Sequence, residues 1–198
     1  MYKYEHGGDV YSSKATADGK SYIDFSANIN PLGLPLGVKE AVKSALKYCV
    51  NYPDPFCREL RAATAKYLRV AEENIFFGNG AADVLFRLAL ALKPKKALLL
   101  APTFADYEKA LRSVDCKINY YNLQPQRDFK IGKSILRAIT STTDVVVICN
   151  PNNPTGKVMG EKEFDLLKEI GEVCLKRGVF VIDDLVYRDI TFDENNIA

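Results

Sequence analysis

The hydrophobic positions in the first third of the chain recur at helical spacing. Across residues 35–49, apolar side chains return every three or four positions, with lysines and a glutamate between them. This spacing predicts an amphipathic helix. A second helical pattern covers residues 60–68 and follows the segment 52–55, whose two prolines prevent one helix from continuing into the next. The two predicted helices precede the main sheet.

From residue 74 onward, short apolar runs alternate with helical patterns. The runs predict strands at 75–77, 97–101, 117–123, 144–149 and 179–182, and the patterns predict helices at 81–92, 105–114, 133–138 and 161–176. The last two strands are rich in β-branched residues and are expected to be buried. The last helix is expected to carry Phe164, Leu167, Ile170 and Val173 on one face. Strands that alternate with helices predict an α/β layer structure with a parallel or mostly parallel sheet.

Residues suited to ligand binding follow these strands. In parallel sheets, ligands bind beyond the carboxyl ends of the strands. Four segments occupy such positions: residues 78–83, 102–104, 150–156 and 183–184. We therefore expect one binding site, formed by loops that are far apart in the sequence.

The segment Gly-Asn-Gly-Ala-Ala-Asp at residues 78–83 joins a predicted strand to a predicted helix. Its small residues allow a ligand close to the backbone, and amides at a helix N-terminus suit an anion such as phosphate. A plain tight turn is an equally valid interpretation of this hexapeptide. A dinucleotide-binding turn is disfavoured, because Asp83 stands where that fingerprint has a small residue.

The segment Asn-Pro-Asn-Asn-Pro-Thr-Gly at residues 150–156 is more specific. Two prolines restrict the loop after a buried strand, and its side-chain amides are expected to face the same end of the sheet. Asp184 would be a carboxylate at another strand end, with Tyr187 three residues later. A lone aspartate is also commonly a helix cap or a surface acid.

The composition points to small-molecule ligands. The chain of 198 residues is 47% hydrophobic, which suits one sizeable core, and its 27 basic and 25 acidic residues leave a net charge of +2. The basic residues are dispersed, so no nucleic-acid or membrane surface is predicted. Five widely spaced cysteines without a Cys-x-x-Cys pair are expected to be reduced packing residues. No signal peptide or membrane span is expected, and a cytoplasmic location follows.

In this order, the motifs resemble those of the aspartate-aminotransferase-like superfamily of pyridoxal-phosphate enzymes, over nearly the whole chain. The resemblance implies a three-layer α/β/α fold with a mostly parallel sheet. It also implies that Asp184 pairs with the protonated ring nitrogen, although Asp183 is a competing candidate and Leu185 stands where the family usually has Glu. The other implied contacts are Gly80, Ala81 and Ala82 with the cofactor phosphate, Phe104 stacked on the ring, and Asn153 and Tyr187 with the phenolic oxygen.

Two N-terminal segments narrow the resemblance. Residues 24–33 and the sequence His6-Gly-Gly8 look like those of threonine-phosphate decarboxylases, whereas histidinol-phosphate aminotransferases carry a shorter version of the first segment. The resemblance implies that Asn30 and His6 lie near the substrate, although a histidine near a terminus is commonly just exposed. It further implies a homodimer in which Tyr52 reaches the cofactor phosphate of the partner subunit.

The implied reaction is decarboxylation of L-threonine O-3-phosphate, a step in cobalamin side-chain assembly. Two alternatives are a histidinol-phosphate-type aminotransferase and a non-catalytic fragment that binds a phosphate ligand or a partner.

In this family, the lysine that binds the cofactor as a Schiff base follows the Asp-x-x-Tyr motif by a few tens of residues. The sequence contains no lysine in that position, and Lys157 and Lys168 are interpreted as surface charges. We expect residues 1–50 to form an N-terminal segment with a helix. Residues 51–198 are expected to form an incomplete large domain, without the C-terminal small domain. Little or no turnover is expected of the 198-residue chain alone.

Overall fold

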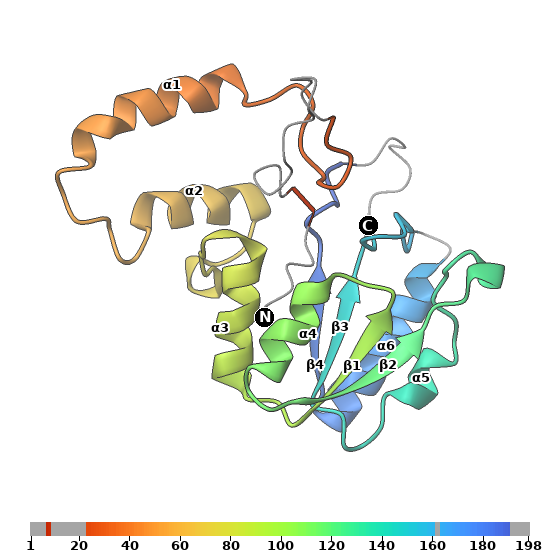
Figure 1. Ribbon diagram of the computed structural model, residues 1–198. Helices are drawn as coiled ribbons and strands as arrows, with labels where there is room; N and C mark the ends of the chain where they lie inside the picture. Colours follow the sequence, from red (N-terminus) through yellow and green to blue (C-terminus); the bar gives the residue numbers. More distant parts are fainter. Residues whose placement is uncertain (1–6, 9–22, 161–162, 191–198) are drawn as a thin grey trace. The chain divides into compact units, whose positions relative to one another are not determined.

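The computed structural model describes residues 7–8, 23–160 and 163–190, and the chain forms two compact units (Figure 1). The first unit is Met1–Phe76 and the second unit is Phe77–Ala198. Each unit is described by itself. The predicted limits of an N-terminal segment 1–50 and a large domain 51–198 stay predictions. His6 lies outside the described residues.

The first unit carries the two helices that the hydrophobic pattern predicts. They are α1 (Leu36–Ala45), extended by the 3-10 turn η1 (Leu46–Tyr48), and α2 (Arg58–Leu68), followed by η2 (Glu72–Asn74). Asp54 determines where α2 begins, because its carboxylate accepts hydrogen bonds from the backbone N–H groups of Phe56 and Arg58 at 3.1 and 2.8 Å. The break between the predicted helices is therefore confirmed.

The second unit is a four-stranded parallel sheet covered on both faces by helices (Figure 1). Its elements are α3 (Gly80–Leu92), β1 (Lys96–Ala101), α4 (Ala105–Arg112), β2 (Lys117–Asn122), η3 (Pro125–Arg127), α5 (Ile135–Ala138), β3 (Val145–Cys149), α6 (Phe164–Arg177) and β4 (Phe180–Asp184). The strand order is β2-β1-β3-β4. Helices α3 and α4 pack on one face, and α5 and α6 pack on the other. This confirms the predicted three-layer α/β/α fold.

Two apolar clusters fix the sheet between its helix layers. Side chains alternate along a strand, so β1 and β3 contribute to both clusters. Val145 and Val147 of β3 face α3 and α4, whereas Val146 and Ile148 face α5 and α6. Every residue of β3 is buried, which explains its run of apolar residues and confirms the prediction of a buried strand.

Two strand predictions are wrong. Residues 75–77 form no strand, because no strand of the described sheet pairs with them. Strand β4 forms as predicted but is not buried, since Phe180 is 59% and Val181 41% exposed. It pairs with β3 on one side and lies at the edge of the described sheet. A β-branched run therefore marked the strand without marking its burial.

The prediction for the last helix is confirmed for three of its four residues, because Ile170 lies in the core and the half-buried Leu167 and Val173 pack against it. The buried residues of α6 are Leu166, Ile170 and Cys174, whereas the ring of Phe164 is exposed and contacts the Lys168 ammonium. Both stripes have helical spacing and share Ile170. The core-facing side of α6 is centred on the stripe that includes the small Cys174, because the helix must approach the strands closely, and Leu167 and Val173 flank this stripe.

The five cysteines are all free, as predicted, but not all of them are packing residues. Cys116, Cys149 and Cys174 are buried, whereas Cys49 is exposed and Cys57 is half-buried. Burial raises the pKa of the Cys149 thiol above its ordinary value, although a hydrogen bond with Tyr107 and one from the backbone of Asn153 work in the opposite direction. Among the described residues, no helix has the length and apolar character needed to cross a membrane.

Candidate functional site

Three loops meet at the carboxyl edge of the sheet in the second unit. They follow β1, β3 and β4, whose carboxyl ends share one edge because the strands are parallel. The backbone N–H of Asn150 donates to the carbonyl oxygen of Asp184 at 2.9 Å, which joins the loops after β3 and β4. The hydroxyl of Thr103 donates to Asn152 Oδ1 at 3.1 Å, which joins the loops after β1 and β3.

Asp184 is a half-buried carboxylate whose two oxygens are both held. Its Oδ2 accepts a hydrogen bond from Tyr107 Oη at 2.6 Å, and its Oδ1 accepts one from the backbone N–H of Val186 at 2.9 Å. Within the described part of the chain it forms no ion pair. Because a carboxylate has about four acceptor sites, it retains capacity for a cationic donor.

The two adjacent aspartates lie on opposite faces of the sheet. In the register of β3 and β4, Asp184 is opposite Cys149 and Asp183 is opposite Ile148. Cys149 belongs to the cluster beneath α3 and α4, and Ile148 to the cluster beneath α5 and α6. Asp184 therefore shares the α4 face with Tyr107, and the competing candidate Asp183 does not.

Phe104 and Tyr107 lie together at the start of α4. Phe104 is the N-cap residue of that helix, and the two ring centroids are 5.5 Å apart with the planes inclined at 79°. This edge-to-face arrangement is favourable for aromatic rings. The spacing of three residues brings the two side chains onto one side of the helix start.

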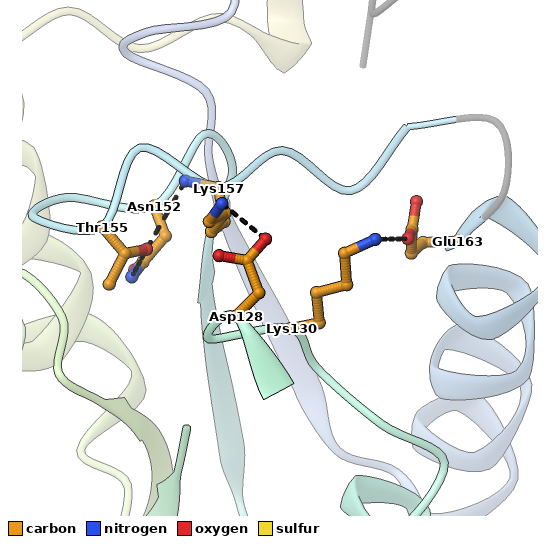
Figure 2. Close-up of polar contacts among 6 residues, drawn as sticks. All are labelled: Asp128, Lys130, Asn152, Thr155, Lys157 and Glu163. Atoms are coloured by element: carbon orange, nitrogen blue, oxygen red, sulfur yellow. Dashed lines mark hydrogen bonds and ion pairs between the residues drawn. The ribbon is translucent and has the colours of Figure 1, made fainter. Parts of the chain in front are cut away.

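Asn152 is a buried polar hub that joins two of the loops. It is 5% exposed, and its side-chain N–H groups donate to the carbonyl oxygen of Pro102 at 3.1 Å and to the hydroxyl of Thr155 at 2.9 Å. Its backbone N–H donates to the carbonyl oxygen of Lys157 at 2.8 Å, so the loop curls back on itself (Figure 2). The conformation of the loop after β3 therefore depends on the loop after β1.

Asn153 differs from its neighbour Asn152. Its backbone N–H donates to Cys149 Sγ at 3.5 Å, whereas its half-buried side-chain amide makes no hydrogen bond with any residue in the described ranges. The amide group is thus held on a fixed backbone and keeps its hydrogen-bonding capacity.

Two ion pairs tie the far side of this loop to the segment after β2. Lys157 Nζ lies 2.6 Å from Asp128 Oδ2, and Lys130 Nζ lies 3.4 Å from Glu163 Oε1 (Figure 2). These pairs are largely exposed and contribute little stability individually. Lys157, predicted to be a surface charge, is therefore ion-paired.

The N-terminus of α3 lies toward the same edge of the sheet (Figure 1). Helix geometry leaves the first backbone N–H groups, including those of Ala81 and Ala82, without partners inside the helix. Gly80 has a φ of +79°, and a side chain there would meet no atom within 4 Å. The carboxylate of Asp83 accepts hydrogen bonds from the backbone of Asn79 at 3.0 Å and from Arg87 at 2.8 Å, and these contacts lower its pKa.

Gly78 allows this turn to close, which leads to a prediction about stability. A Cβ at this position would lie 2.8 Å from Asp83 Oδ2 and 2.9 Å from Val84 Cγ2. We expect Gly78→Ala to reduce the free energy of unfolding by about 1–3 kcal/mol, measured by urea denaturation. Gly171→Ala is the control, because position 171 lies within α6 in open space and should gain about 1 kcal/mol. Equal midpoints for Gly78→Ala and wild type would contradict the prediction.

The other predicted site residues belong to both units. Asn30 belongs to the first unit and closes a local turn, with its amide donating to the carbonyl oxygen of Gly33 at 3.1 Å. Tyr52 is in the first unit and is fully exposed. Tyr187 follows β4 in the second unit and is half-buried.

The sequence interpretation missed two residues of this site. Tyr107 was counted only as part of a helical pattern, although its spacing of three from Phe104 was a usable signal. Asn152 was not distinguished from the other residues of its loop, because nothing in the sequence indicates which amide of an Asn-Asn pair turns inward. Together the loops present a carboxylate, an amide and a helix N-terminus, which suit a ligand that carries a cationic ring nitrogen and an anionic group.

Comparisons with known proteins give consistent findings. The sequence model described as Aminotransferase class I and II matches residues 20–198. The threonine-phosphate decarboxylase of Salmonella typhimurium is 35% identical over 192 residues, which cover 96% of this chain and 52% of that protein. The histidinol-phosphate aminotransferase of Moorella thermoacetica is 33% identical, over 89% of this chain and 45% of that protein.

A solved structure is similar in fold. The aspartate aminotransferase from Thermus thermophilus with maleate superposes with a TM-score of 0.79 at 24% identity, over 87% of this chain and 47% of that one. The chain spans about half the length of the curated relatives that it matches.

Proposed function

The chain belongs to the aminotransferase class I and II family, and from this premise we propose that the carboxyl edge of its sheet binds pyridoxal 5'-phosphate. Enzymes of this family depend on pyridoxal phosphate. One observation carries the proposal: Asp184, Phe104 and the Asn153 loop, which are far apart in the sequence, are connected by hydrogen bonds and a ring contact at one edge.

The residues at this edge fit the chemical groups of the cofactor. Asp184 carries a negative charge without an ion-pair partner among the described residues, which suits a protonated pyridine nitrogen. The Asn153 amide keeps hydrogen-bonding capacity for the phenolic oxygen. At the N-terminus of α3 the backbone N–H groups of Ala81 and Ala82 have no partner inside the helix, and a Cβ at Gly80 would meet no atom within 4 Å, which suits a phosphate.

Each of these residues has a proposed part in holding the cofactor. Phe104 covers one face of the ring, and Tyr187 joins Asn153 at the phenolic oxygen. Gly80, Ala81 and Ala82 bind the phosphate, with the amides of Ala81 and Ala82 as donors, because the N–H of Gly80 donates to the carbonyl oxygen of Gly78 at 3.0 Å. When bound, pyridoxal phosphate supplies an electron sink for a substrate that loses a bond at Cα. The part of Asp184 is to keep the proton on the ring nitrogen, because its charge stabilises the protonated form.

We propose decarboxylation of L-threonine O-3-phosphate, a step of cobalamin biosynthesis, as the activity of the protein that contains this chain. The support is the segment 24–33, which resembles that of threonine-phosphate decarboxylases, together with the similarity to the Salmonella enzyme. In this proposal Asn30 and His6 lie near the substrate. The protein is a homodimer in the cytoplasm, and Tyr52 serves the cofactor phosphate of the partner subunit.

A histidinol-phosphate-type aminotransferase is the second candidate, favoured by the relatives of that name. The two candidates differ in the bond that breaks, so they are separated by their products. The full-length gene product is expected to release carbon dioxide from L-threonine O-3-phosphate without a 2-oxo acid. Amino transfer from histidinol phosphate to 2-oxoglutarate, without release of carbon dioxide, would favour the second candidate instead.

Cofactor binding by the 198-residue chain is tested with pyridoxamine 5'-phosphate. This ligand has an amine in place of the aldehyde, so surface lysines cannot capture it covalently. We expect saturable binding in a fluorescence titration and much weaker binding of pyridoxamine, which lacks the phosphate. Equal binding of both ligands would refute the phosphate site at α3, and absence of binding would favour a non-catalytic role or another ligand.

A further inference from the structure

Tyr107 contacts two of the proposed cofactor residues and is itself shielded from solvent. It is the third residue of α4, faces the sheet and is 1% exposed. Its hydroxyl reaches Asp184 and its ring reaches Phe104. Neither the proposed ring stacking nor the proposed pairing with the ring nitrogen assigns any part to this residue.

The contact with Asp184 is a short charge-assisted hydrogen bond in which Tyr107 is the donor. The distance from Oη to Oδ2 is 2.6 Å, which lies in the range for a hydroxyl and a carboxylate. Burial raises the pKa of the Tyr107 hydroxyl far above its ordinary value, and the hydrogen bond to Asp184 adds to this effect. The hydroxyl therefore stays protonated, and Asp184 can only accept.

Few other polar groups face this carboxylate. From β3, the thiol of Cys149 interacts with the same tyrosine hydroxyl. On β4, Asp183 points to the opposite face, and after β4 the backbone N–H of Val186 holds Oδ1. Tyr187 lies in the turn that follows. Apart from Val186, Tyr107 is thus the group that fixes the direction of the Asp184 side chain within the described residues.

The contact with Phe104 fixes the ring that is proposed to stack on the cofactor. Phe104 precedes α4 and has an extended backbone, so its ring orientation depends on packing rather than on the helix. The edge of one ring meets the face of the other at 79°, an arrangement that resists rotation of Phe104.

We propose that Tyr107 is a positioning residue that sets both walls of the cofactor site, through its hydroxyl to Asp184 and through its ring to Phe104. This inference rests on the proposed binding of pyridoxal phosphate. One rigid side chain then sets the distance between the Phe104 ring and the Asp184 carboxylate. A flat ligand must match this distance. Such coupling prepares the site before the ligand arrives, so less ordering is needed on binding.

The dissociation constants of two ligands distinguish this positioning role from a general loss of structure. Pyridoxamine 5'-phosphate has the ring nitrogen, and 1-deazapyridoxamine 5'-phosphate has CH in its place, so the ratio of their dissociation constants reports the interaction with Asp184. We expect the wild-type chain to favour the first ligand by about 10-fold to 100-fold. Tyr107→Phe keeps the ring and removes the hydroxyl. It should reduce this preference by about 2-fold to 10-fold while leaving binding of the deaza ligand unchanged.

Tyr107→Leu is the companion variant, because it removes the ring contact as well. It should weaken both ligands, and the urea midpoint of each variant shows that the chain is folded. A Tyr107→Phe chain that keeps the full preference, or that loses affinity for both ligands equally, would overturn the positioning role. A wild-type chain that binds both ligands equally, or neither, would refute the proposed cofactor site itself, and the role of Tyr107 would fall with it.

Discussion

Replacing Asp184 by asparagine is expected to weaken binding of pyridoxamine 5'-phosphate by about 10-fold to 100-fold at neutral pH. The carboxylate is half-buried and has no ion-pair partner among the described residues, so its charge is available to the ring nitrogen. Asparagine keeps the size of the side chain and removes the charge. The bound ring should then lose its proton at lower pH, which the ultraviolet absorbance of the ligand reports.

The chain contains a matched control for this change. Asp183 is the adjacent residue and an identical side chain, but it faces the layer of α5 and α6. Its pKa is raised by desolvation and by the charge of Asp184. Asp183→Asn should leave both affinity and ring protonation as in the wild type. If Asp183→Asn had the larger effect, the assignment of the ring partner would be reversed.

Asn152→Ala is expected to lower the free energy of unfolding by about 1–3 kcal/mol and to weaken cofactor binding as well. The substitution removes a buried side chain that holds Pro102, Thr103 and Thr155. The partly buried hydrogen bond to the carbonyl of Pro102 would be lost. Urea denaturation measures the stability, and titration with pyridoxamine 5'-phosphate measures the affinity.

Asn153→Ala should separate the two effects. Its side chain makes no hydrogen bond with the described residues, so stability should change by less than about 0.5 kcal/mol. The affinity should still fall by about 2-fold to 10-fold, because one hydrogen bond to the ligand is lost. A large loss of stability in Asn153→Ala, or none in Asn152→Ala, would show that the roles of the two asparagines had been exchanged.

The length of the relatives determines which protein each experiment requires. Because the chain spans about half of their length, the binding variants test the site in the second unit, whereas the reaction must be tested in the full-length gene product. The two kinds of result are independent. A chain that binds the phosphorylated ligand as expected would support the cofactor site, whatever the outcome of the activity assays.

The sequence alone determined the order and type of nearly all the elements, the layered fold and the family. Local signals suffice for the elements and the fold, because helical spacing, prolines and β-branched runs act over a few residues. The family, and Asp184, Phe104 and Asn153 as candidates, followed from the resemblance of the motifs after the predicted strands.

Only the tertiary structure decided which neighbours act and which face each residue occupies. The burial of β4 depends on its place in the sheet, and which of Asp183 and Asp184 lies on the α4 face depends on the pairing of β4 with β3. Tyr107 and Asn152 act through partners that lie 77 and 50 residues away in the sequence. A hydrogen bond between distant residues has no periodic signature in a sequence, because it arises from the packing of whole elements.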